Sequence, residues 1–133
     1  MAKKFMIVDE HAVSRHLVRV ASTTPLDTVL ECTSPAEALK AIGVFQPDCV
    51  MMGVTLPAPS AIKAIKIIRQ THPEVRVVAV SNLHEQEVKQ AANEAGADGY
   101  VSSENLSELF LLAAPERLMV KPPGRGKNRG GSK

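Results

Sequence analysis

Two adjacent carboxylates, Asp9 and Glu10, directly follow the short apolar run 5–8 near the start of the chain. Carboxylate oxygens are good ligands for hard metal cations, so the pair is a candidate metal site. Negative side chains also favour the first turn of a helix, where the helix dipole is positive. The pair therefore predicts either a weak metal site or a helix start, and the helix start is the simpler interpretation.

Other polar candidates follow apolar runs later in the chain. Ser81 follows the β-branched run 75–80, and Ser102 and Ser103 follow the short run 99–101. No sequence of the form GxGxxG or GxxxxGK[ST] lies between a predicted strand and helix, and no residue is placed as an activating base for Thr55. The sequence therefore favours a protein that is not an enzyme.

The elements that must position these residues alternate between strand and helix. Apolar runs predict strands at 5–8, 27–32, 49–54, 75–80 and 99–101. Helical spacing of apolar residues predicts a helix after each strand, as with Val13, Leu17, Val20 and Ala21. Five such units form a parallel sheet covered on both faces, and its functional crevice lies outside the carboxyl ends of the strands. We expect these residues there: Asp9, Glu10, Gly53, Ser81, Asn82, Ser102 and Ser103.

Local start and stop residues support several of these helices. Ser34 is a predicted N-cap, followed by Pro35 at the first helical position and Glu37 at the third. Gly43 and Gly96 are predicted to end the second and fourth helices. A fifth helix is predicted over 106–113.

Composition limits the class of protein. The 133 residues, 44% of them apolar and 3% aromatic, fit one domain with an aliphatic core. Cys32 and Cys49 form neither a disulfide framework nor a metal-ligand spacing, and no apolar run has membrane-spanning length. We expect a cytoplasmic protein without a signal peptide.

Charge divides the chain in two. Residues 1–114 carry ten basic and thirteen acidic side chains, whereas residues 115–133 carry six basic and one acidic. The second segment is also rich in Gly and Pro, which disfavours folding of the segment by itself. We therefore predict a domain over 1–114 and a basic flexible tail over 115–133, with no output domain.

Four segments together resemble the receiver domain of two-component response regulators, over roughly residues 3 to 113. They are KFMIVDEH at 4–11, QPDCVMMGVTLP at 46–57, VVAVS at 77–81 and EAGADGYV at 94–101. The resemblance implies an α/β fold with a doubly wound, five-stranded parallel sheet, of the flavodoxin-like (βα)5 type with strand order 2-1-3-4-5.

The resemblance also implies roles for single residues. Such domains use an acidic pair and an aspartate after the third strand to hold Mg²⁺ and accept a phosphoryl group, aided by a hydroxyl residue and a lysine. Asp9 and Glu10 match the acidic pair, and Ser81 matches the hydroxyl position. Gly53 stands at the aspartate position and Ser103 at the lysine position.

Glycine has no side chain that can attack a phosphoryl donor, so the family's reaction is not expected here. Asp9 and Glu10 leave too few oxygen ligands for a strong Mg²⁺ site, and we expect weak or absent binding and no other cofactor. The prediction is a stand-alone, degenerate receiver that acts in signal transduction by phosphorylation-independent protein–protein interaction.

The resemblance further implies a partner surface on the fourth helix, fifth strand and fifth helix. Tyr100 matches the family's aromatic switch position, and apolar residues cover more than one face of the segment 106–113. Tyr100, Phe110 and Leu111 are therefore predicted to contact a signalling protein or a second copy of the chain. Alternatively, residues 118–120 fold back and cover this surface.

A second hypothesis concerns the basic tail. Arg125-Gly126 and Arg129-Gly130-Gly131 resemble the Arg/Gly segments that contact nucleic-acid backbones. In this alternative, the receiver-like body is a scaffold or dimeriser, and residues 121–133 bind phosphates with strong salt dependence. No membrane contact is expected.

Overall fold

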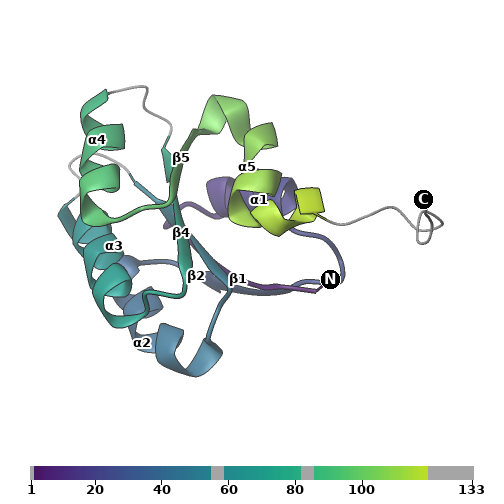
Figure 1. Ribbon diagram of the computed structural model, residues 1–133, viewed down its shortest axis with the longest axis horizontal. Helices are drawn as coiled ribbons and strands as arrows, with labels where there is room; N and C mark the ends of the chain where they lie inside the picture. The colour runs from purple at the N-terminus through teal and green to yellow at the C-terminus, as the bar shows by residue number, and fades with distance from the viewer. Residues whose placement is uncertain (1, 55–58, 82–85, 120–133) are drawn as a thin grey trace.

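A five-stranded parallel sheet with the order β2-β1-β3-β4-β5 lies at the centre of the molecule (Figure 1). The computed structural model describes residues 2–54, 59–81 and 86–119 of the chain. The strand order expected from the resemblance is confirmed, as is the flavodoxin-like (βα)5 class. The strands are β1 Lys4–Val8, β2 Thr28–Cys32, β3 Cys49–Gly53, β4 Arg76–Ser81 and β5 Gly99–Ser102. Thr55, Asn82 and the basic segment 121–133 lie outside the described residues.

Helices cover both faces of this sheet, α2, α3 and α4 on one side and α1 and α5 on the other (Figure 1). Their bounds are α1 Ala12–Ser22, α2 Pro35–Phe45, α3 Pro59–Thr71, α4 Gln86–Ala95 and α5 Leu109–Ala113, with 3₁₀ turns η1 Ser103–Glu108 and η2 Pro115–Met119. No helix in the described part of the chain has the length and apolar character needed to span a membrane.

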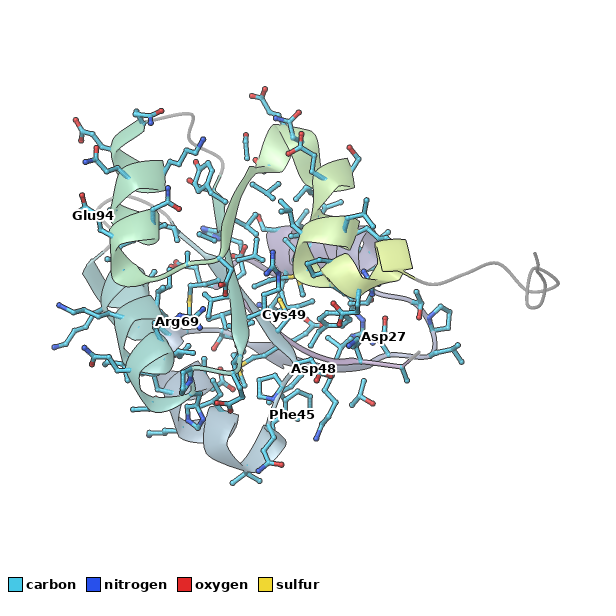
Figure 2. The ribbon with its side chains drawn as sticks, in the orientation of Figure 1. Asp27, Phe45, Asp48, Cys49, Arg69 and Glu94 are labelled. Atoms are coloured by element: carbon cyan, nitrogen blue, oxygen red, sulfur yellow. The ribbon has the colours of Figure 1, made fainter. Side chains whose placement is uncertain are left out.

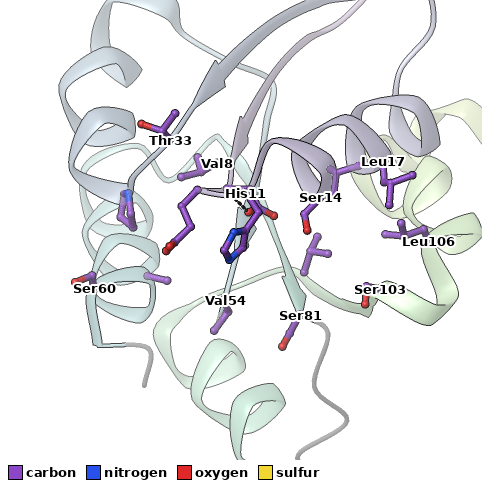
Figure 3. A pocket seen from close by; sticks show the side chains of 17 residues that line it. Val8, His11, Ser14, Leu17, Thr33, Val54, Ser60, Ser81, Ser103 and Leu106 are labelled. Atoms are coloured by element: carbon purple, nitrogen blue, oxygen red, sulfur yellow. Dashed lines mark hydrogen bonds between the residues drawn. The ribbon is translucent and has the colours of Figure 1, made fainter. Parts of the chain in front are cut away.

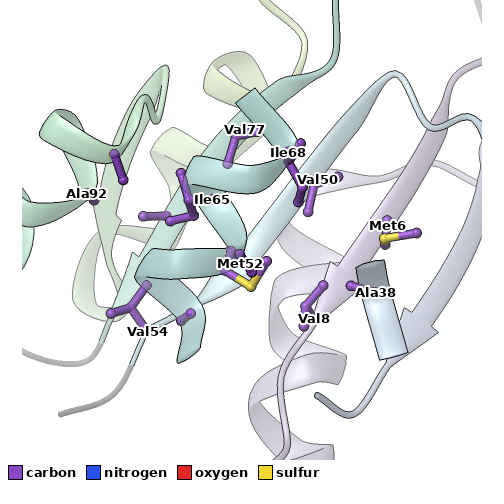
Figure 4. Packing of buried hydrophobic residues seen from close by; sticks show 14 of the residues in the cluster. Met6, Val8, Ala38, Val50, Met52, Val54, Ile65, Ile68, Val77 and Ala92 are labelled. Atoms are coloured by element: carbon purple, nitrogen blue, oxygen red, sulfur yellow. The ribbon is translucent and has the colours of Figure 1, made fainter. Parts of the chain in front are cut away.

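The sheet divides the core into two halves, and strand β3 contributes side chains to both of them. Its side chains alternate between the faces of the sheet, so Val50 and Met52 pack under α2, α3 and α4, and Cys49 and Met51 pack under α1 and α5. All four are at most 1% exposed. Figure 4 shows the first half, with Ile65 of α3 above the sheet. A strand covered on both faces is continuously apolar, as predicted.

The local signals of α2 are partly confirmed. The hydroxyl of Ser34 accepts a hydrogen bond from the backbone N–H of Glu37 at 3.1 Å, as an N-cap does. The predicted stop at Gly43 is wrong, because the helix continues to Phe45 and Gln46 takes the left-handed cap conformation with φ 55°. Burial of Ile42 and partial burial of Phe45 against the core explain the extra half turn. Gly96, with φ 108°, does follow the end of α4.

The fifth helix is shorter than the predicted 106–113. A 3₁₀ turn occupies Ser103–Glu108, with a non-helical Asn105 inside it, and α5 begins only at Leu109. Leu109 and Ala113 are buried in the core below α1 and α5. These two buried residues lie one turn apart, on the face of α5 that packs against the sheet.

The described structure continues past the predicted boundary at residue 114. Arg117 of η2 donates hydrogen bonds to the carbonyl oxygens of Ser22 and Phe110, and its guanidinium lies 3.7 Å from the centroid of the Phe110 ring. It also lies 3.4 Å from the carboxylate of Asp27, the residue labelled in Figure 2. Arg117, which the sequence places in the tail, therefore contacts the folded body, and the boundary at residue 114 stays a prediction.

Candidate functional site

A cavity of about 590 Å³ opens at the carboxyl ends of the strands (Figure 3). This is the crevice that the βα alternation predicts. It brings together five residues that the sequence nominated, and its described lining contains no Lys or Arg. Those five residues are Asp9, Glu10, Gly53, Ser81 and Ser103.

Asp9 is held in the loop between β1 and α1. Its backbone N–H donates to the carbonyl oxygen of Cys32 at 3.0 Å, and its Oδ1 accepts from the backbone N–H of His11 at 2.8 Å. His11, not Asp9, is the N-cap of α1, and its side chain makes no capping bond. The carboxylate of Asp9 therefore stabilises the loop before α1 and does not cap the first turn of the helix. The side chain of Glu10 is exposed.

Gly53 ends β3 beside this loop, paired in register with Val80 of β4. An ideal Cβ on Gly53 would lie 3.0 Å from the carbonyl oxygen of Val8 and 3.2 Å from Oδ2 of Asp9. These separations are tighter than ordinary van der Waals contact, so the strand end is packed closely around a residue without a side chain.

Three serines mark the ends of β4 and β5. Ser81 pairs in register with Ser102, and both are buried, at 2% and 8% exposure. The Oγ of Ser102 accepts a hydrogen bond from the backbone N–H of Glu104 at 3.3 Å, which caps η1. Ser103 is exposed at the rim of the cavity. Neutral hydroxyls thus form this side of the crevice.

Arg15 is the cation behind the acidic loop. Its Nη1 donates to the carbonyl oxygen of Asp9 at 2.8 Å, and its Nε donates to Glu31 of β2 at 2.8 Å. Hydrogen bonds from Arg15 and then Arg19 hold the pKa of Glu31 below its ordinary value. Sequence reasoning missed Arg15, because periodicity does not indicate that a helical arginine reaches back to a loop six residues earlier.

The sequence predicts weak or absent Mg²⁺ binding, and the fit of this ion to the crevice depends on the oxygen donors present. Asp9 and Glu10 supply two carboxylates, but Gly53 supplies none, and one oxygen of Asp9 already accepts a hydrogen bond from His11. Within residues 2–54, 59–81 and 86–119, no group of three or more His, Cys, Asp or Glu side chains gathers as a metal site. Mg²⁺ demands near-octahedral oxygen ligation, which these donors do not match.

The predicted partner residues do not share one core cluster. Tyr100 is half-buried and packs with the core under α2, α3 and α4. Phe110 and Leu111 lie on α5, across the sheet, and are 36% and 40% exposed. The guanidinium of Arg117 stacks on Phe110, so residue 117 covers part of this surface. The side chains of residues 118–120, predicted as an alternative cover, lie outside the described structure.

The response regulator receiver domain family matches residues 5–111. The chain belongs to this family. As a receiver domain it is 28% identical, over 77% of its length and 85% of the relative, to the chemotaxis protein CheY of Halobacterium salinarum. It is 31% identical to the response regulator GacA of Pseudomonas syringae, over 86% of its own length and 56% of the relative. The chain thus spans about half the length of that regulator.

Solved structures agree with this assignment of the receiver domain. A two-component response regulator of the LuxR family from Aurantimonas superposes with a TM-score of 0.73 at 29% identity, covering 98% of this chain and 90% of that one. The BeF₃-activated receiver domain of DrrB gives a TM-score of 0.73 at 27% identity, covering 90% and 98% of the two chains. The receiver domain's role in two-component signalling follows from these relationships.

Proposed function

We propose that this receiver domain is degenerate and transmits signals by protein–protein contact without aspartyl phosphorylation. The observation that carries the proposal is Gly53 at the end of β3, with the carboxylate of Asp9 beside it. Aspartyl phosphorylation needs a carboxylate nucleophile at the crevice, and a glycine offers none. Tight packing around Gly53 is what a strand end adapted to glycine requires.

The surrounding charges support the same proposal. Phosphoryl transfer depends on cations that stabilise the charge on the transferred group. Ser103 occupies the position of the family's lysine, and no described residue lining the cavity is a Lys or an Arg. A crevice with two carboxylates and neutral hydroxyls opposes the approach of an anionic phosphodonor.

The proposal includes three further statements about this chain. The protein is not an enzyme and uses no cofactor. Mg²⁺ binds weakly or not at all, because Asp9 and Glu10 give an incomplete ligand set. The protein works in the cytoplasm.

Partner binding remains assigned to α4, β5 and α5, where Leu111 offers the largest exposed apolar fraction among the three nominated residues. The relatives named above are a chemotaxis protein and a response regulator, which supports a signalling protein as the partner. The nucleic-acid alternative is not favoured, because the match to the receiver-domain family over residues 5–111 supports a signalling role.

Treatment with acetyl phosphate and Mg²⁺, followed by intact-mass measurement, tests the proposal. The expected result is an unchanged mass, while a receiver domain with an aspartate at the end of its third strand, treated in parallel, gains one phosphoryl group. A phosphoryl adduct mapped to any residue lining the crevice overturns the proposal. If the mass of the control receiver domain also stays unchanged, the phosphodonor has not reacted. Another phosphodonor is then used until the control gains its phosphoryl group.

A further inference from the structure

The cavity at the carboxyl ends of the strands holds two carboxylates without a basic side chain to balance them. None of the Lys and Arg residues in the described part of the chain lines this cavity. The ion pairs formed among the described residues also leave out Asp9 and Glu10. The segments 55–58 and 82–85, outside the described residues, contain no Lys or Arg in their sequence. Of the sixteen Lys and Arg residues of the chain, the other five lie in 121–133.

The arginine nearest to the acidic loop is directed elsewhere. Arg15 donates to the backbone carbonyl oxygen of Asp9 and to the carboxylate of Glu31, at 2.8 Å in each case. The carboxylate of Asp9 accepts its hydrogen bond from the backbone N–H of His11, which is a neutral donor. A neutral donor satisfies a hydrogen bond but leaves the negative charge in place. The crevice therefore keeps a negative charge that a cation from another part of the chain can pair with.

The segment 121–133 carries the complementary charge. It contains five Lys or Arg residues and no Asp or Glu, whereas residues 1–114 carry ten basic and thirteen acidic side chains. Four glycines in the segment allow its backbone to approach a surface closely. Opposite charges on two parts of one chain attract each other, and their contact requires no second molecule.

The start of this segment lies within reach of the crevice. Arg117 of η2 donates to the carbonyl oxygen of Ser22 at 3.0 Å, and Ser14, eight residues earlier in α1, lines the cavity. At about 1.5 Å per residue, about 12 Å separates these two positions along the helix axis. A flexible chain of about six residues has a root-mean-square span of roughly 12–15 Å. The basic residues from Arg125 onward can therefore reach the cavity.

The walls of the cavity suit a long basic side chain. Leu17 of α1 and Leu106 of η1 line the same cavity as the carboxylates (Figure 3). Lys and Arg lay their apolar stems along such residues and keep the charged end among polar groups. An exposed ion pair is weak by itself, but a short tether raises the local concentration of the basic side chains to the millimolar range. A contact that is weak between separate molecules is therefore populated within one chain.

We propose that the basic segment 121–133 of this chain occupies the crevice, where a Lys or Arg side chain from 125–133 pairs with the carboxylates of Asp9 and Glu10. The segment then supplies the positive charge that Ser103 does not. The inference rests on the proposed function, because a crevice filled by the chain itself requires neither a phosphoryl group nor a metal ion. A partner that draws the segment away opens the crevice, which regulates the receiver domain without phosphorylation.

Paramagnetic broadening in the full chain tests where the segment lies. Ser132→Cys provides a thiol for a nitroxide label, and Cys32 and Cys49 do not compete for it because they are 1% and 0% exposed. We expect the amide NMR signals of the loop 9–11 and of Gly53 to lose at least about half of their intensity at low salt. The intensity should return at about 0.5 M NaCl, because salt screens the attraction.

A matched pair of variants isolates the carboxylates of the crevice. Glu10→Gln removes one carboxylate from the cavity lining, and Glu74→Gln removes an exposed carboxylate from the turn before β4, at the opposite end of the strands. Both variants change the net charge by one unit. We expect Glu10→Gln to reduce the broadening at Gly53 by at least about half and Glu74→Gln to change it by less than about a tenth. Thermal unfolding checks that both variants remain folded.

Several results overturn the inference. Full intensity of the loop 9–11 at low salt, broadening that persists at high salt, or equal effects of the two variants each do so. A mixed sample identifies the chain that supplies the segment. Nitroxide-labelled chains without ¹⁵N are added to ¹⁵N-labelled chains without nitroxide, and broadening of the loop 9–11 in this mixture overturns the inference, because the segment of a second copy then fills the crevice.

Failure of the proposed function is read separately, from the intact mass after treatment with acetyl phosphate. An unchanged mass without broadening overturns only this inference. A phosphoryl adduct in the crevice together with broadening overturns only the proposed function.

Discussion

The carboxylate of Asp9 fills the space beside Gly53, so that a β-carbon at residue 53 would lie 3.2 Å from Oδ2 of Asp9. The carbonyl oxygen of Val8 closes the same space at 3.0 Å. A glycine at this strand end is therefore part of the packing of the crevice, and not simply a missing functional group.

Gly53→Ala is expected to lower the free energy of unfolding by about 1 kcal/mol, because the added methyl group is compressed against backbone. Gly43→Ala is the matched control. A Cβ at residue 43 meets nothing within 4 Å, so alanine in that exposed helical position should raise the free energy by about 0.5–1 kcal/mol. Urea unfolding measures both, and a stabilising Gly53→Ala would contradict this account of the strand end.

Gly53→Asp combined with Ser103→Lys should regain Mg²⁺-dependent phosphorylation. The new aspartate adds a nucleophile and a third carboxylate beside Asp9, and the lysine adds a cation. Gly53→Asp without the lysine should unfold at lower temperature than the wild type and regain stability when Mg²⁺ is added, because the two carboxylates repel each other. Intact mass and thermal unfolding measure these effects. A folded double variant that stays inert contradicts the expectation.

Arg117→Gln should lower the free energy of unfolding by about 2–3 kcal/mol. The variant loses the bonds to Ser22 and Phe110 and leaves the Asp27 side chain, 1% exposed, without its cation. Asp27 keeps the bonds from the backbone N–H groups of Lys3 and Thr24, which limits the loss. Arg117→Lys retains the positive charge but not the several N–H donors of the guanidinium, and its free energy of unfolding should fall by less. A loss below about 0.5 kcal/mol for Arg117→Gln would show that η2 does not hold the domain together.

The pair of arginines on Glu31 predicts a pH dependence of stability. Because the folded pKa of Glu31 is lowered, the pair stabilises the fold above the ordinary value of 4.5, and this contribution is lost as pH falls through the folded pKa. Glu31→Gln should cost about 0.5–1 kcal/mol at neutral pH, a small effect because water screens the pair. The difference between wild type and variant should shrink in acid. Urea unfolding at neutral pH and in acid measures this difference in the free energy of unfolding. A difference that grows in acid would contradict the lowered folded pKa of Glu31.

Much of the fold could be predicted from the sequence, because the residues that specify it act locally. The run at 49–53 is apolar on both faces, Ser34 caps its helix, and Gly96 takes a positive φ. The errors arose where tertiary contacts decide. Burial of Ile42 and partial burial of Phe45 carry α2 past Gly43.

The position of the candidate site could be predicted from the sequence, but some of its contacts could not. The carboxyl ends of parallel strands meet at one edge, so Asp9, Gly53 and Ser81 were expected to line one crevice. The contact of Arg15 with the Asp9 loop and the exposure of Val13 and Leu17 depend on how α1 is rotated on the sheet. Apolar spacing predicts a helix and not which side of it is buried.

Amide NMR of the wild-type chain during titration with Mg²⁺ and then acetyl phosphate tests the central claim most directly. A phosphorylation-independent receiver predicts shifts limited to Asp9, Glu10 and the neighbourhood of Gly53, or no shifts at all, after both additions. Mg²⁺-dependent shifts that spread to Ser81, Tyr100 and α5 when the phosphodonor is added would contradict it, because the crevice would then still switch the partner face.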